Sequence, residues 1–403
     1  MPVVAACLVS GLPNSCAPIF RTMLLLRVLV LLLLLIVLPP VVLDRLLSGR
    51  KSKTRTRFLL FAPSAVMLLW CAFVLFFPGA TWATTLFLFF LLAFCLPEFL
   101  FMLFVSLGRL LPSKILRNVF TIIGAVLAVL VLYVATIGFW DSNRRFRVVE
   151  HRVVVPRLPD SFNGFRICQF SDFHLGSFCG DTAFVARVCD SINATRADLI
   201  VFTGDLVNQH SCEADPYRSL LASLHSPHGV VSILGNHDYM IYARQSRENQ
   251  VRDIQRLCNL EKEAGWVLLR NENLLLSNGT DTIALLGSEN SGRTPFPDRG
   301  DLGKTLRGVP EGMTKILLTH DPAQWEKSVV PDTDIDLTLS GHTHGLQIDF
   351  PFFHPCKLVH KHGAGFYNSG DRLLFVNTGI GAALIPFRYG VWPEINVLVL
   401  SNH

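Results

Sequence analysis

Hydrophobic residues are distributed in two different ways along this 403-residue chain. Before residue 141 they form long runs, comparable to the roughly 20 helical residues that are needed to cross a bilayer. After residue 141 the runs are short and alternate with helix-like stretches, as in a soluble domain. The long runs predict four membrane-spanning helices: Met23–Leu43, Phe58–Phe77, Thr81–Leu107 and Val119–Trp140.

The same pattern predicts how the chain is organised. We expect an N-terminal segment 1–22, a membrane region 23–140, a linker 141–161 and a folded domain 162–403. The domain has roughly 240 residues, enough to bury the core of one α/β unit. The first run could also be a signal-peptide core, but it lacks a small-x-small cleavage site and three more runs follow it, which favours an anchor. Residues 1–22 carry little pattern, and Met23 is an alternative start of translation.

Lysine and arginine residues between the runs predict the orientation. They are concentrated at Arg45–Arg57, between the first and second runs, and at Arg109–Arg117, between the third and fourth. An excess of positive charge in short loops marks the cytoplasmic side, so the domain after an even number of spans is expected outside the cytoplasm. Arg144, Arg145, Arg147 and Arg152, just after the last run, argue for the opposite orientation.

Net charge and cysteine spacing indicate which binding partners and cross-links to expect. The net charge of +5 comes largely from the basic clusters that flank the apolar runs, at 50–57 and 144–147, so a nucleic-acid partner is not expected. Membrane lipids are the expected neighbours. Ten cysteines without any Cys-x-x-Cys pair predict neither a disulfide framework nor a zinc ribbon.

Five short apolar runs in the domain predict strands: Phe165–Phe170, Ala197–Thr203, Gly229–Leu234, Lys315–Thr319 and Ile335–Ser340. The helix-like stretches Asp181–Thr195 and Pro216–Leu224 separate the first three, which is typical of β-α-β units. In such folds, residues that follow the strands meet at the carboxyl edge of the sheet.

Polar residues that bind metals follow every one of these runs. They form five motifs: Asp172-Phe173-His174, Gly204-Asp205-Leu206-Val207-Asn208, Gly235-Asn236-His237-Asp238, Thr319-His320 and Gly341-His342-Thr343-His344. Carboxylate, amide and imidazole groups suit Mn, Fe or Zn as ligands. The motifs contain more of these groups than one ion can coordinate. We therefore expect two metal ions.

The spacing within the motifs suggests how the ligands are aimed. If Asp172 and His174 lie on a strand end, the two-residue alternation of a strand would point both to one face, and His342 and His344 would repeat this geometry. Glycines flank the ligands where a positive φ or a close backbone approach is expected: Gly204, Gly235, Gly341 and Gly345.

The five motifs, in this order, resemble those of the calcineurin-like metallophosphoesterase superfamily, and most of all its membrane-attached bacterial branch. The resemblance covers about residues 165–400 and implies an α/β fold, a two-sheet sandwich flanked by helices. It implies that one ion is held by Asp172, His174, Asp205 and His344. The second ion would be held by Asp205, Asn236, His320 and His342.

The resemblance also implies catalytic roles. His237 would lie beside the scissile phosphate, to stabilise charge or protonate the leaving oxygen, with Asp238 orienting it or bracing the loop. Gln209 departs from the arginine that many relatives carry near this position, which puts a phosphate clamp there in doubt. Arg388 is a candidate replacement as a substrate-binding residue, although surface arginines are common.

The expected function is a membrane-anchored, dinuclear-metal phosphoesterase that hydrolyses a phosphodiester or pyrophosphate in a lipid or cell-envelope substrate. One alternative is a cytoplasm-facing hydrolase of nucleotide-linked lipid precursors, similar to UDP-diacylglucosamine hydrolases. Another is a metal-bound binding module without catalysis, although such members usually lose motif residues. The metal identity, the preference for monoester or diester, the oligomeric state and a possible cap at 239–314 stay open.

Three further residues have two readings each. Glu98, within the third run, is either a functional group at membrane depth or, as we favour, a helix end or a polar contact between helices. His360 and His362, near two lysines, either form a basic lip that meets an anionic substrate or lipid or, as we favour, belong to a solvated face.

Overall fold

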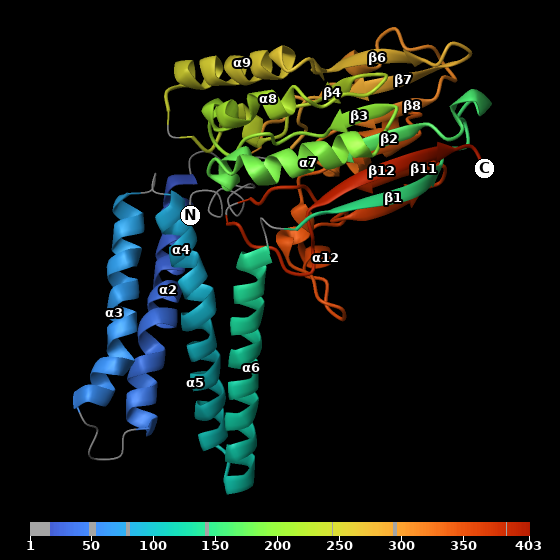
Figure 1. The fold of residues 1–403 in the computed structure, drawn as a ribbon. Helices are drawn as coiled ribbons and strands as arrows, with labels where there is room; N and C mark the ends of the chain where they lie inside the picture. The colour runs from blue at the N-terminus through green and yellow to red at the C-terminus, as the bar shows by residue number, and fades with distance from the viewer. Residues whose placement is uncertain are drawn as a thin grey trace. The chain divides into compact units, whose positions relative to one another are not determined.

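The computed structural model describes residues 17–47, 54–77, 81–141, 145–243, 245–292, 296–383 and 385–403. The chain divides into two compact units, one ending at Asp141 and the other beginning at Ser142. Figure 1 shows that the first unit consists of helices and that the second contains the strands. Most of the segment 1–22, the basic stretch 50–53 and the connection 78–80 lie outside the described residues.

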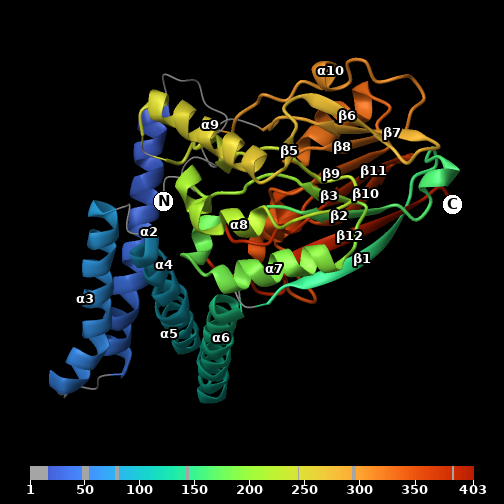
Figure 2. The same ribbon diagram turned by 45° about the horizontal axis from the view of Figure 1, so that its top comes forward.

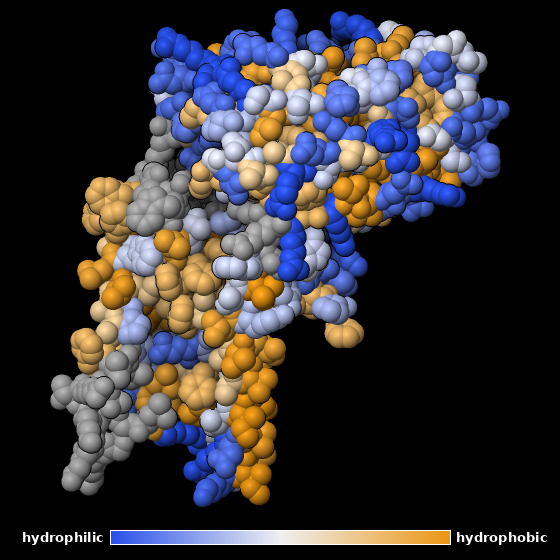
Figure 3. Space-filling model, in the orientation of Figure 1, coloured by the Kyte–Doolittle hydropathy of each residue, from blue (hydrophilic) through white to orange (hydrophobic). Residues whose placement is uncertain are grey.

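The first unit contains long apolar helices. They are α2 (Ala17–Leu47), α3 (Thr54–Phe76), α4 (Thr81–Phe90), α5 (Leu96–Arg109) and α6 (Lys114–Asp141). Within the described residues, three stretches are long and apolar enough to cross a membrane: Arg27–Leu46, Ala83–Arg109 and Lys114–Trp140. The apolar part of α3, Phe61–Phe76, is shorter. Much of the visible surface of this unit is hydrophobic (Figure 3), as membrane association requires.

The third apolar run folds as two α-helices joined by a π-helical turn at Leu91–Cys95. Pro97 follows in the first turn of α5, together with the half-buried Glu98. Farther along, α5 and α6 pack closely through two glycines. A Cβ atom at Gly108 would lie 2.9 Å from Phe120 Cβ, and one at Gly124 would lie 2.8 Å from Phe104 Cβ. Such small residues let membrane helices approach each other.

Two six-stranded mixed sheets build the second unit. The first has the order β1 (Arg147–Val154), β12 (Glu394–Ser401), β2 (Arg166–Phe170), β3 (Leu199–Phe202), β4 (Val230–Ser232) and β5 (Val267–Leu268). The second has the order β10 (Gly365–Ser369), β11 (Arg372–Val376), β9 (Leu337–Ser340), β8 (Lys315–Leu318), β7 (Thr282–Gly287) and β6 (Glu272–Ser277). The five predicted strands are β2, β3, β4, β8 and β9.

Strand alternation creates a core on each side of the first sheet. Ile167 and Val201 point toward Ile316 and Leu339 of the second sheet, in a core between the two sheets. Their neighbours Cys168 and Phe202 point to the outer face, where they join a second core. Helices α7 (Thr182–Ala194), α8 (Arg218–Leu221) and α9 (Arg247–Glu263) cover that face, as Figures 1 and 2 show.

The second sheet is covered in a similar way. Its outer face packs on a third core that includes Leu286, Leu317 and Trp325. Short helices contribute there or in the loops: α10 (Leu302–Thr305), α11 (Val330–Asp332) and α12 (Cys356–Val359). This is the two-sheet sandwich flanked by helices that the motifs predicted.

Two segments differ from their sequence-based interpretation. The stretch 141–161, expected as a linker, contains β1, which pairs in parallel with β12 from Arg147 opposite Glu394 to Val154 opposite Ser401. It is an edge strand whose side chains are mostly exposed, so its sequence lacks a strong apolar signal. Residues 239–314, considered as a cap, instead supply α9, β5, β6, β7 and α10 to the sandwich.

One buried carboxyl group makes the stability of this unit depend on pH. Glu261 of α9 accepts a hydrogen bond from the Ser232 hydroxyl, and its Oε1 has no partner within the described part of the chain. Burial and the nearby Asp238 raise the pKa of Glu261 from 4.5 to about 8. The folded state therefore keeps this proton between these two pH values, and stability declines as the pH rises through that window.

We expect Glu261→Gln to remove this decline, because an amide has no proton to lose. The midpoint of thermal unfolding in detergent should match the parent near pH 4.5 and exceed it by roughly 10 °C at pH 9, since each kcal/mol shifts the midpoint by roughly 2–4 °C in a domain of this size. Glu311→Gln, at an exposed position, is the matched control. Identical pH profiles of the parent and Glu261→Gln would contradict the prediction.

Candidate metal centre

The predicted ligands gather where strands of both sheets end. Strands β2, β3 and β4 run parallel in one sheet, and β8 and β9 run parallel in the other. The motif residues directly follow their carboxyl ends, on an edge of the sandwich. Those that are buried are Asp172, His174, Asp205, Asn236, Asp238, His320 and His344, whereas His237 and His342 are partly exposed.

The backbone aims these residues by left-handed conformations. The strands end at Phe170 and Ser340, and positive φ angles follow at Asp172 (48°), His174 (47°), Asp205 (63°), His342 (75°) and His344 (51°). The expectation that strand alternation aims Asp172 and His174 is therefore wrong. Positive φ costs energy for residues with a Cβ atom, and such strain accumulates at functional sites.

Hydrogen bonds between the loops hold this backbone. The amide of Asp172 donates to Gly204 O at 2.8 Å, and that of His174 donates to Asp205 O at 3.1 Å. Glycines then admit the side chains. A Cβ atom at Gly235 would lie 2.2 Å from Asp205 Oδ1, and one at Gly341 would lie 2.3 Å from Asp172 Oδ2.

Asp172, His174 and His344 form the first group of possible metal ligands. His174 Nε2 lies 3.1 Å from His344 Nε2, and His344 Nε2 lies 3.3 Å from Asp172 Oδ1. Two donors that each lie about 2.0–2.2 Å from one ion are about 3.0–3.4 Å apart. The spacing of this group therefore fits a shared ion.

Asp205, His320 and His342 form a second group, which Asn236 joins. His320 Nε2 lies 3.1 Å from both Asp205 Oδ2 and Asn236 Oδ1, and Asn236 Oδ1 lies 2.8 Å from His342 Nδ1. Asp205 Oδ2 also lies 3.7 Å from His174 Nε2 of the first group. Asp205 is thus between the two groups.

Electrostatics of the centre favour a cation. Burial lowers the pKa of His174 to about 3, and burial together with His174 holds the pKa of His344 well below its usual range. These neutral imidazoles have lone pairs to offer. Burial raises the pKa of Asp172 to about 6, and Asp205 adds to the shift. Although burial opposes a charged imidazole, Asp205 raises the pKa of His320 to about 10, which shows that the Asp205 carboxylate attracts positive charge to this place.

His237 and Asp238 have different environments. His237 Nδ1 lies 2.7 Å from the carbonyl oxygen of Asn208, to which it can donate, and a ring nitrogen of His237 also comes within 4.8 Å of ligand atoms of His174 and Asp205. Asp238 is turned away from this ring. Its carboxylate accepts hydrogen bonds from the amides of Asp205 at 2.8 Å and Gly235 at 2.9 Å, so it braces two ligand loops.

Sequence reasoning missed Tyr242. Its hydroxyl accepts a hydrogen bond from Asn236 Nδ2 at 2.9 Å, which directs Asn236 Oδ1 toward His320 and His342. Its ring lies 4.2 Å from the His237 ring, centroid to centroid. No motif marks Tyr242, because only the fold of the loop after Asp238 brings it back to the centre.

Arg388, expected to bind substrate, is fully buried. Its Nε donates to Gly381 O at 3.0 Å, and its Nη2 donates to Thr378 O at 2.9 Å and lies 3.1 Å from His344 Nδ1. The guanidinium therefore packs behind a possible metal ligand rather than facing solvent, and its pKa is lowered to about 10 by burial.

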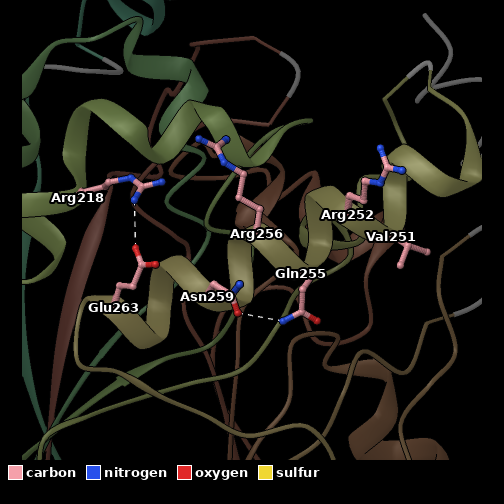
Figure 4. Close-up of a pocket in the computed structure, with 7 residues that line it drawn as sticks. All are labelled: Arg218, Val251, Arg252, Gln255, Arg256, Asn259 and Glu263. Carbon is pink, nitrogen blue, oxygen red and sulfur yellow. Dashed lines mark hydrogen bonds and ion pairs between the residues drawn. The ribbon is translucent and has the colours of Figure 1, made fainter.

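A separate hollow of 460 Å³ lies on α8 and α9 (Figure 4). It is lined by Arg218, Val251, Arg252, Gln255, Arg256, Asn259 and Glu263, and none of the motif residues takes part. Its arginines are paired: Arg218 with Glu263 at 3.1 Å and Arg256 with Asp215 at 2.6 Å. We regard it as an ion-paired surface groove.

Comparison with known proteins shows the family. The family model described as calcineurin-like phosphoesterase matches residues 165–346. The uncharacterized metallophosphoesterase YkuE of Bacillus subtilis is 33% identical over 265 residues, which are 63% of this chain and 85% of YkuE. The chain is a calcineurin-like metallophosphoesterase. As such, it is a metal-dependent phosphoric ester hydrolase.

Two further relatives of this metallophosphoesterase bear on membranes and lipids. A bovine protein described as a transmembrane protein with metallophosphoesterase domain is 30% identical, over 68% of this chain and 62% of its own length. The UDP-2,3-diacylglucosamine pyrophosphatase LpxG of Chlamydia trachomatis is 27% identical, over 56% of this chain and 81% of its own length. Together with the apolar helices, these relatives make the chain a membrane-associated member of the family.

We expect Gly235→Ala to disturb the centre without preventing folding. The φ angle of Gly235 is not positive, so alanine suits its own backbone conformation, but the new Cβ would meet Asp205 Oδ1 at 2.2 Å and the backbone nitrogen of Asp205 at 2.5 Å. Displacing a ligand by about 1 Å can lower activity by 10²-fold. Metal content by elemental analysis and hydrolysis of bis(p-nitrophenyl) phosphate should both fall.

The control is Gly303→Ala, where the nearest atom to the added Cβ is Asp301 Oδ1 at 3.5 Å. It should keep the metal content and activity of the parent. Parental metal content in Gly235→Ala would show that Asp205 can move freely.

Proposed function

We propose that this metallophosphoesterase is a dinuclear, membrane-anchored enzyme that cleaves a phosphodiester or pyrophosphate in a lipid or cell-envelope substrate. The observation that carries the proposal is the position of Asp205 between two groups of ligands with the spacing of metal sites. One ion would be held by Asp172, His174, Asp205 and His344. The other would be held by Asp205, Asn236, His320 and His342.

The donor set fits Mn, Fe or Zn. Imidazole nitrogens with carboxylate and amide oxygens are borderline-to-hard ligands, and no thiolate is among them. Ions bound there would supply Lewis-acid stabilisation of the phosphoryl oxygens and a water of lowered pKa.

The remaining residues of the centre either transfer a proton or hold the ligands in position. With Nδ1–H of His237 donating to Asn208 O, its Nε2 is the atom that can exchange a proton with the leaving oxygen. Tyr242 orients Asn236, Asp238 braces the loops, and Arg388 ties the backbone of the late loop together behind His344 by donating to Gly381 O and Thr378 O. In this scheme His237 is catalytic, whereas the other three are positioning residues.

Substrate class follows from location and similarity. The chain runs from α6, which ends at Asp141, to β1, which begins at Arg147, so only a few residues tether the hydrolase to its membrane helices. The relative LpxG is a pyrophosphatase of a lipid-linked nucleotide by its name. A lipid-linked phosphodiester or pyrophosphate is therefore the class of substrate we propose.

Orientation separates two versions of this function. We propose four spans, with α3 as the second, and a hydrolase outside the cytoplasm, because of the basic residues between the first and second spans and between the third and fourth. The similarity to LpxG favours a second version, in which the substrate is a nucleotide-linked lipid precursor. In this version the hydrolase would face the cytoplasm.

The ligand and proton-transfer roles can be separated by two variants. Asp205→Ala should lose both metal equivalents and all hydrolysis, because its carboxylate serves both groups. His237→Ala should keep two equivalents of metal while turnover falls by about 10²–10⁴, the usual effect of removing an acid–base group. Elemental analysis and steady-state kinetics with Mn, Fe and Zn check both. Two bound metals in Asp205→Ala would refute the shared ligand, and parental turnover of His237→Ala on substrates with a poor leaving group would refute its role.

A topology experiment decides between the two versions. A reporter that is active only outside the cytoplasm should give signal when fused after His403 and none when inserted between Arg50 and Arg57. The reverse pattern would place the centre in the cytoplasm and favour the nucleotide-linked precursor.

A further inference from the structure

The loop that carries His342 and His344 ends in an exposed apolar tip, which we define as residues 350–359. Exposed fractions there are 99% for Phe352, 53% for Phe353, 76% for Leu358 and 65% for Val359. In the described part of the second unit, the other large exposed hydrophobic residues are spread over β1, α9, β5, β6 and β10, and at most two of them, Val154 and Phe366, line one hollow. Clustered exposed apolar residues mark an interaction surface, whereas scattered ones do not.

Backbone pairing holds the tip in this form. Phe350 and Phe353 exchange two backbone hydrogen bonds, of 3.1 and 3.3 Å, around Pro351 and Phe352. The Asp349 amide donates to Tyr389 O at 2.8 Å, which fastens the tip to the late loop. The exposure of Phe352 is therefore a property of a tight turn and not of a loose chain.

The tip itself carries a basic side chain. Lys357 is exposed on α12, between the apolar side chains, whereas Lys361, just beyond it, pairs with Glu326. Asp349, the acidic residue next to the tip, lies 2.8 Å from His354 Nδ1. Apolar side chains beside a lysine suit the interface of a bilayer that contains anionic lipids.

The tip is also continuous with the metal centre. His342 and His344 lie at the root of the same loop, and the Thr343 hydroxyl donates to Gly363 O on its return. The His360 ring, one residue beyond the tip, lies 6.5 Å from the His342 ring, centroid to centroid. A phosphate group held beside His360 would be close to the proposed ligands.

We propose that residues 350–359 dock into the interfacial layer of the bilayer that holds the chain's own helices, so that a lipid-linked phosphate reaches the centre without leaving the membrane. The delivery step rests on the proposed function, whereas the bilayer contact does not. The occupant is the bilayer because the chain is membrane-associated, the tether is short and the tip combines apolar and basic side chains.

The contact can be tested without activity. The full chain, with Phe352→p-benzoylphenylalanine, is placed in nanodiscs of phosphatidylethanolamine and phosphatidylglycerol and irradiated. Mass spectrometry should find lipid adducts at least fivefold above those of Leu275→p-benzoylphenylalanine, an exposed apolar position on β6. Equal or absent lipid adducts at position 352, or adducts to protein alone, would overturn the contact.

Delivery is tested by a ratio of rates. For the parent, Phe352→Ser/Leu358→Ser and Leu275→Ser, hydrolysis of CDP-diacylglycerol in the nanodisc is divided by that of bis(p-nitrophenyl) phosphate in solution. The ratio should fall at least fivefold in the double variant only, and an unchanged ratio would overturn delivery. Lipid adducts in a chain that hydrolyses neither probe would reject the proposed function and retain the contact, whereas hydrolysis without excess adducts would reject the contact.

Discussion

The buried carboxylate of Asp205 is the interaction on which the centre depends. It lies between His174, which follows a strand of one sheet, and His320, which follows a strand of the other. An uncompensated charge in such a place costs several kcal/mol, so the two sheets must hold their strand ends in register around it. Three features keep the strand ends in place around Asp205. They are the core between the sheets, the hydrogen bonds to Asp238, and a glycine at position 235, where a Cβ atom would collide with Asp205.

Much of this fold could be predicted from the sequence, because the strands that carry the site are short apolar runs and each is followed by a polar motif. Short apolar runs predicted both ends of β2, β3, β4, β8 and β9 to within two residues, and the polar motif after each run indicated the shared edge. The edge strand β1 could not be recognised in this way, since few of its side chains are buried. The helical segments of the membrane region followed from apolar length, but the π-helical turn and the glycine contacts between α5 and α6 depend on packing that length does not reveal.

The centre was predictable in its members and not in its geometry. Residue types and order identified the possible ligands, but their left-handed backbone is imposed by hydrogen bonds from distant loops, such as that from Asp172 N to Gly204 O. Tyr242 and Arg388 illustrate the same limit. Tyr242 contacts Asn236 and Arg388 lies beside His344 only because the fold brings these residues together. Neither the spacing of the residues nor their type predicts these contacts.

The loop after β9 combines two demands. Its root must hold His342 and His344 within a few tenths of an ångström of their positions, as a metal site requires. Its tip exposes Phe352 and Leu358, which would make a flexible loop collapse onto the nearest apolar surface. The paired turn at Phe350 and Phe353 and the bond from Asp349 to Tyr389 prevent this by fixing the tip. A rigid loop with ligands at one end and apolar side chains at the other also fixes the distance from the centre to whatever surface the tip contacts.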